Sequence, residues 1–103
     1  MRRNEVVLDG RLLKRNALRH TPAGTPVIDI LIGHNSIQIE AGSERKTRCE
    51  IEATAIGEMA IALAAVKLNR LLRISGFLAQ RAVSSSQLAL HVVKVEPIRG
   101  DQE

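Results

Sequence analysis

Apolar and polar residues alternate along much of this chain, in short runs that are bounded by turn-forming residues. Every second residue in the middle of the segment 45–56 is apolar, namely Cys49, Ile51 and Ala53. The positions between them are charged, namely Arg48, Glu50 and Glu52. A period of two predicts a strand with one buried and one solvated face. We therefore expect Cys49 to be a buried, inert thiol on the inner face.

Four other segments have the β-branched and leucine-rich composition of strands: 5–14, 27–33, 70–81 and 88–98. Gly10 and Gly76 lie inside two of them, where a glycine often marks a bulge or a sharp bend. The segment 34–44 is mostly polar, and we expect a turn at Ala41-Gly42-Ser43.

One segment changes period. The stretch 57–68, GEMAIALAAVKL, is rich in Ala and Leu with apolar residues at helical spacing, so it predicts a short helix. Two segments predict loops, 15–25 and 82–87. In the first loop, Pro22 suits the first central position of a turn, and Gly24 can supply a positive φ.

The resulting order is three strands, one helix and two strands. This order predicts an all-β fold, a five-stranded OB-fold Greek-key barrel with one short helix between its third and fourth strands. Another five-stranded barrel or an open α+β sheet fits the order less well. With 103 residues, the chain fits a single OB-fold domain over 1–103 with a short tail at about 99–103.

Composition narrows the class of protein. The chain contains no Trp or Tyr and one Phe, Phe77, so we expect an aliphatic core. No apolar run reaches the 18 residues that span a membrane, and the N-terminus does not resemble a signal peptide. Cys49 is the single cysteine, which points to a reducing cytoplasm. The histidines and this cysteine have no metal-ligand spacing, and no catalytic or phosphate-loop motif occurs, so we expect no cofactor, no metal and no enzyme.

The positive charge is concentrated at one end of the sequence. Up to His20 the chain has six basic residues, Arg2, Arg3, Arg11, Lys14, Arg15 and Arg19, and two acidic ones, Glu5 and Asp9. The rest of the chain is neutral, so this segment carries the whole net charge of +4. Such asymmetry indicates a polyanionic partner. The same cations could instead only keep an exposed loop soluble.

Three stretches carry a family resemblance: NEVVLDGRLLK, RHTPAGTPVIDILIGHNS and SGFLAQR. They resemble the bacterial single-stranded-DNA-binding OB proteins, and more closely the primosomal replication protein N (PriB) family. The pattern H-x-S-x-Q-x-E-A-G, from His34 to Gly42, and the lone cysteine point to PriB in particular. General single-strand-binding proteins normally add a long tail with an acidic tip, which we do not expect after Glu103.

The resemblance implies a homodimer of OB-folds that binds single-stranded DNA in replication restart. It implies partnership with the PriA helicase and hand-over to DnaT, without enzymatic activity. The candidate DNA-binding residues are Lys14, Arg15, Arg19, Asn35, Arg45, Lys46, Arg48 and Arg81. Four of them match positions where members of the family contact DNA: Lys14, Arg19, Asn35 and Arg48.

The aromatic side chains that stack on bases are mostly missing. Arg48 stands where the family can present a tryptophan, and Ser43 stands at a position that can be aromatic. Base stacking contributes roughly 1–3 kcal/mol per base, so we expect weak, salt-sensitive binding. If about four cations contact phosphate, log K should fall with log salt at a slope near −0.7 per contact.

Several alternatives stay open. Arg48 could form a solvated cross-strand ion pair with Glu50 or Glu52, Phe77 could pack in a core or a dimer, and His34 and His91 could be structural. The whole chain could be an OB module for protein contacts with vestigial nucleic-acid binding, and RNA could replace DNA as the ligand.

Overall fold

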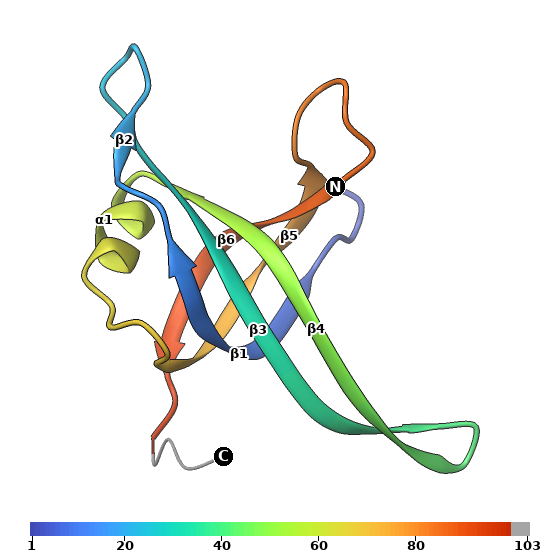
Figure 1. Cartoon of the computed structure of the whole chain (residues 1–103). Helices are drawn as coiled ribbons and strands as arrows, with labels where there is room; N and C mark the ends of the chain where they lie inside the picture. Colours follow the sequence, from blue (N-terminus) through green and yellow to red (C-terminus); the bar gives the residue numbers. More distant parts are fainter. Residues whose placement is uncertain (100–103) are drawn as a thin grey trace.

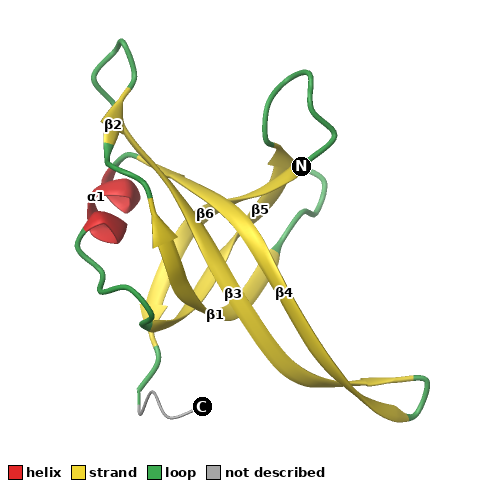
Figure 2. Ribbon diagram, viewed as in Figure 1, coloured by secondary structure: helices red, strands yellow, loops and turns green. Residues whose placement is uncertain are grey.

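The computed structural model describes residues 1–99, which form six β-strands and one short α-helix (Figure 1 and Figure 2). The strands are β1 (Val6–Arg15), β2 (Arg19–His20), β3 (Pro26–Glu40), β4 (Ser43–Ile56), β5 (Leu71–Gln80) and β6 (Leu88–Pro97), and the helix is α1 (Glu58–Ala64). Arg99 is the one residue of the predicted tail 99–103 that lies within the described residues. No helix in the described range is long and apolar enough to cross a membrane.

The five long strands close into a barrel. The sheet order is β1-β5-β6-β4-β3-β2, and a further pairing between β1 and β3 joins its ends. Neighbouring strands are antiparallel except β4 and β6, which pair in parallel at Ala53–Leu90 and Thr54–His91. This is the predicted OB-fold barrel, with the helix between β4 and β5. The two-residue β2 is an addition, because it forms the ascending side of the predicted first loop.

The barrel encloses an aliphatic core, as the composition predicts. Its fully buried large side chains are Leu12, Ile28, Ile32, Leu63, Leu72, Ile74 and Leu90. Strand β5 approaches β6 so closely that a Cβ at Gly76 would lie 1.9 Å from the His91 carbonyl oxygen. The pairing of β5 with β6 also shifts register at this glycine, as the strand-interior glycine predicts.

The helix is shorter than predicted, since it ends at Ala64 instead of continuing to residue 68. Its buried residues, Ala60 and Leu63, close one end of the barrel. After the helix, the backbone N–H of Asn69 donates to the carbonyl of Leu12 at 2.6 Å. The segment that follows Ala64 thus leads to β1 instead of continuing the helix, although the composition of residues 65–68 favours a helix.

The β3–β4 hairpin is longer than predicted and extends away from the barrel (Figure 1). Residues 34–40, expected as a polar connection, continue β3 because each pairs with a residue of β4. The predicted turn is confirmed: Ala41 and Gly42 both have positive φ, at 52° and 82°, as a two-residue type I′ hairpin turn requires.

The prediction that Cys49 is buried is wrong, because its side chain is exposed. Ile51 and Ala53 have the same parity in β4 and turn toward the core, as predicted. Cys49 lies farther along the hairpin, where the strand has left the barrel and no core remains on its inner side. Alternation therefore gave the correct side of the strand but not the burial.

Candidate nucleic-acid interface

Strands β3 and β4 contribute to two open grooves, and one face of the two strands points away from the barrel core. Cross-strand partners on this face include Asp29 with Thr54, Leu31 with Glu52, and Asn35 with Arg48. The first pairs lie at the barrel end that carries the two projecting loops, and the last pair begins the extended hairpin (Figure 1).

The first groove lies between the 19–26 hairpin and the β5–β6 loop, and we call it the loop groove. It has a volume of about 740 Å³. Three of the predicted cations line it: Lys14, Arg19 and Arg81. The predicted turn of the 19–26 hairpin is confirmed: the backbone N–H of Gly24 donates to the Thr21 carbonyl at 2.8 Å, which places Pro22 at the first central turn position, and Gly24 has a positive φ.

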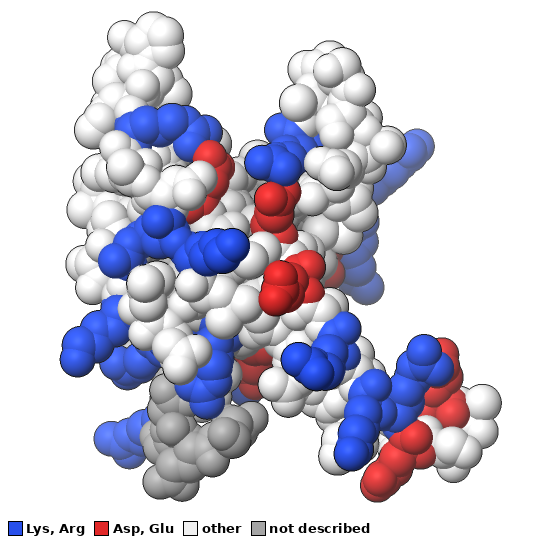
Figure 3. Space-filling model, in the orientation of Figure 1, with Lys and Arg blue, Asp and Glu red and all other residues white. Residues whose placement is uncertain are grey.

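Two acidic residues occupy the same groove, and the sequence analysis did not single them out as site residues. Asp29 of β3 forms an ion pair with Arg19, and Glu52 of β4 forms one with Arg81, with 2.6 Å between Oε2 and Nη1. Positive and negative side chains therefore alternate over this face (Figure 3). Lys14 forms no ion pair with any residue in the described range.

The second groove lies where the hairpin leaves the barrel, and we call it the hairpin groove. It measures about 1210 Å³ and is lined by Asn35, Lys46 and Arg48 together with the aliphatic Ile37. Within residues 1–99 neither Lys46 nor Arg48 has an ion-pair partner, so the alternative pairing of Arg48 with neighbouring glutamates does not form. Ile37 is 60 % exposed.

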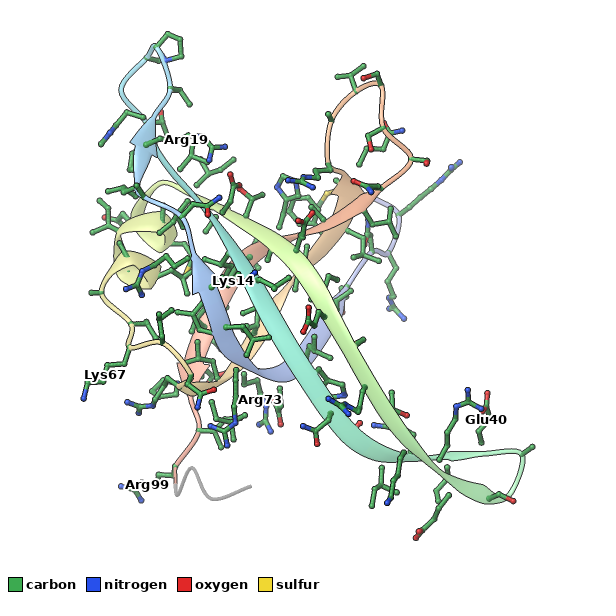
Figure 4. The ribbon with its side chains drawn as sticks, in the orientation of Figure 1. Lys14, Arg19, Glu40, Lys67, Arg73 and Arg99 are labelled. Atoms are coloured by element: carbon green, nitrogen blue, oxygen red, sulfur yellow. The ribbon has the colours of Figure 1, made fainter. Side chains whose placement is uncertain are left out.

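Arg73 also lines the hairpin groove, and sequence reasoning missed it. It comes from β5 and reaches the groove because β5 pairs with β1 (Figure 4). Its guanidinium donates to both carboxylate oxygens of Asp9, at 2.8 and 3.0 Å. The hydrogen bond from Arg73 lowers the pKa of the Asp9 carboxyl below its ordinary value. No sequence signal links residues 9 and 73.

Arg45 and Arg15 line neither groove. Arg45 pairs across the hairpin with Gln38, which does line the hairpin groove, but its guanidinium forms a 3.1 Å ion pair with Glu40. Arg15 donates from Nη1 to the carbonyl oxygens of Leu63, at 3.3 Å, and Val66. These carbonyls end the helical segment, where a cation is favourable. The structure therefore gives Arg15 a structural role.

His34 and His91 both make structural contacts, which is the alternative given for them above. His34 Nδ1 donates to the Asp9 carbonyl at 2.6 Å, which leaves Nε2 to accept from the Ser36 hydroxyl at 2.8 Å. The ring of His91 stacks on Phe77 with a centroid distance of 5.0 Å and an interplanar angle of 9°. Phe77 remains 40 % exposed, so it is not part of the core. Within the described residues, no three His, Cys, Asp or Glu side chains group as metal ligands would.

Comparisons with known proteins agree with this geometry. Residues 4–94 match the model of a family described as another single-strand binding protein family. The replication restart protein PriB of Bordetella pertussis is 37 % identical over 97 residues, which cover 94 % of this chain and 91 % of that protein. The PriB of Neisseria meningitidis serogroup B is 32 % identical over 97 residues, covering 94 % and 96 %.

Solved structures give the same result. The structure of PriB from Ralstonia solanacearum superimposes with a TM-score of 0.87 at 30 % identity, covering 93 % of this chain and 98 % of that one. The single-stranded DNA binding protein from Thermus aquaticus reaches a TM-score of 0.73 at 22 % identity, covering 94 % of this chain and 50 % of that one. The second similarity supports the fold alone.

Proposed function

This chain belongs to the replication restart protein PriB family, within the single-strand binding proteins, and from this premise we propose that it binds single-stranded DNA during replication restart. One structural observation supports DNA binding independently of the family assignment. Lys46 and Arg48, both without an ion-pair partner in the described range, line one open groove with Asn35. Sequence-independent binding of single strands requires such a cationic channel along the phosphates.

The binding surface has two parts with different chemistry. The hairpin groove offers free cations beside the exposed Ile37, which can contact a base through its aliphatic surface. The guanidinium plane of Arg48 can also stack on a base. The loop groove offers Lys14 as a free cation, whereas its two arginines are ion-paired. About three free cations imply a salt slope near −2.

The protein is further proposed to work beside the PriA helicase and to hand over to DnaT, as the family resemblance implies. Its single thiol, Cys49, fits a reducing cytoplasm. We also propose that the whole chain forms a single OB-fold domain.

A homodimer is proposed from the edge of β1 that pairs with no second strand. Residues Val6–Gly10 pair with β5 on one edge only, because the pairing with β3 starts at Arg11. Val7 on this segment is 66 % exposed. Unpaired strand edges need protection, and pairing with a second copy supplies it. Analytical ultracentrifugation of the wild type and of Val7→Asp tests this, with a shift toward monomer expected for the variant.

One alternative function has a specific observation in its favour. Asp29 and Glu52 place negative charge inside the loop groove, whereas a DNA-binding surface would be more uniformly positive. A mixed surface of this kind suits a protein partner. In this alternative the chain is an OB-fold protein-interaction module of the primosome with weak or vestigial nucleic-acid binding.

Two measurements separate these functions. The first is a fluorescence-anisotropy titration of labelled oligothymidylate, about 30 nucleotides long, at about 50 and 200 mM salt. The second is a pull-down with the PriA helicase. A further titration with oligouridylate compares the affinity for RNA with the affinity for DNA. A salt-dependent affinity for DNA supports the proposed function. Helicase capture without measurable DNA binding at low salt supports the protein-interaction module instead.

A further inference from the structure

We propose that Asp29 and Glu52 limit the DNA affinity of this protein, because each holds an arginine of the loop groove that would otherwise contact phosphate. This inference rests on the proposed single-strand binding function and adds the residues that set its strength. Both acids lie on the outer face of the barrel, and both side chains line the loop groove with their arginines.

The contacts that carry this inference join different strands. Asp29 of β3 pairs with Arg19 of β2, and Glu52 of β4 pairs with Arg81, which directly follows β5. About half of each side chain is exposed, with 55 % and 42 % for the first pair and 54 % and 47 % for the second. A phosphate of bound DNA can therefore reach either guanidinium without unfolding any element.

A carboxylate and a phosphate compete for the same guanidinium. The planar fork of arginine binds either anion through two parallel hydrogen bonds. Exposed ion pairs are individually weak, so phosphate can displace the carboxylate. The displaced carboxylate stays in the groove, however, and repels the phosphate that replaced it. Each acid thus weakens DNA binding in two ways. It occupies an arginine that could bind phosphate, and its negative charge repels the phosphate.

Glu52 also lies close to the path between the free cations Arg48 and Lys14. Leu31 pairs with Glu52, and Asn35 pairs with Arg48, four residues farther along β3. Four residues of a strand span about 13 Å. Lys14 of β1 pairs with Leu31 from the other side, so a DNA strand that runs from Arg48 to Lys14 would pass beside Glu52. The loop groove therefore adds less affinity than its three cations predict.

The experiment compares Asp29→Asn, Glu52→Gln and the double variant with the wild type in the oligothymidylate titration. Both changes keep the shape of the side chain and remove one negative charge. Each single variant should bind about three- to tenfold more tightly at 50 mM salt, and its salt slope should steepen by about 0.7 for each arginine released. Thermal unfolding checks that the variants are folded.

Two controls separate this mechanism from a general change in net charge. Glu58→Gln removes a carboxylate in the first turn of α1 that lines neither groove and has no ion-pair partner in the described range, so it should not change the affinity beyond twofold. The variant Arg19→Gln provides a double-mutant cycle. The gain from Asp29→Asn should largely disappear in the Arg19→Gln background if the acid acts by occupying this arginine.

The outcomes distinguish this inference from the proposed function. If the wild type binds DNA and neither variant binds more tightly than Glu58→Gln, the inference is overturned while the proposed function stands. If only the variants bind measurably, the inference holds and the wild-type activity is latent. If wild type and variants all fail to bind at low salt, both are overturned.

Discussion

The guanidinium of Arg73 donates hydrogen bonds to both carboxylate oxygens of Asp9 and so joins β5 to β1 beside the hairpin groove. The hydrogen bond from Arg73 lowers the pKa of Asp9 below its ordinary value. The folded state therefore favours the ionised carboxylate. This gives a defined pH dependence of stability.

Because the pKa of Asp9 is depressed in the folded state, its contribution to stability is full above the unfolded-state pKa of about 4. It is lost as the pH falls through the lower, folded-state value. The difference in thermal midpoint between wild type and Asp9→Asn should thus be constant from about pH 7 to 5 and shrink below pH 4. Because Asp9 and Arg73 are largely exposed, we expect a small difference. Glu44→Gln, at the hairpin tip, is the control, and a difference that grows in acid would contradict the assignment.

Arg48 should contribute to the affinity for every DNA sequence alike. Arg48→Ala removes a free cation from the hairpin groove, so binding at low salt should weaken about three- to tenfold and the salt slope should become shallower by about 0.7. Lys67→Ala is the matched control, because Lys67 lies beyond the helix at the other side of the molecule (Figure 4). A loss confined to one base composition would count against a phosphate and stacking role.

Arg15 and its neighbour Lys14 should give opposite results. Arg15→Gln removes charged hydrogen bonds to the carbonyls that end the helical segment, so the free energy of unfolding in urea should fall by about 1–2 kcal/mol. DNA affinity should change little. Lys14→Gln should weaken DNA binding and leave the unfolding curve in place. Equal losses of affinity in both variants would mean that Arg15 also contacts DNA.

Gly76 should not tolerate a side chain. In Gly76→Ala the new Cβ would meet the backbone carbonyl of His91, which can move only if β5 and β6 separate. We expect a loss of roughly 2–4 kcal/mol or a failure to fold. The neighbouring Ser75→Ala, measured in the same urea titration, should be nearly neutral. A fully stable Gly76→Ala protein would show that the two strands are farther apart than described.

Cys49 should react in the folded protein. Its thiol is exposed, so a disulfide reagent should modify it at a rate within about tenfold of the rate in denaturant. Cys49→Ser should leave the thermal midpoint unchanged within about one degree, since no core contact is lost. Slow modification that follows global unfolding would instead support the burial that the alternating pattern predicted.

The fold of this protein could be predicted from its sequence, because its strands, turns and strand-interior glycines follow local preferences. Alternation predicted β4, Pro22 with Gly24 and Ala41 with Gly42 predicted two turns, and Gly76 predicted the bulge at which the β5–β6 register shifts. The family could also be read from such local motifs. These features depend on residues that are near one another in the chain.

Which cations are free to contact DNA depends instead on contacts between segments that are distant in the sequence. Arg19, Arg81 and Arg15 looked equivalent to Lys14 in the sequence, but each is held by a group from another element: Asp29, Glu52 and the end of the helix. The exposure of Cys49 likewise depends on where the hairpin leaves the barrel. The physical reason is that ion pairing and burial are set by neighbours in space, which barrel closure brings together from distant parts of the chain.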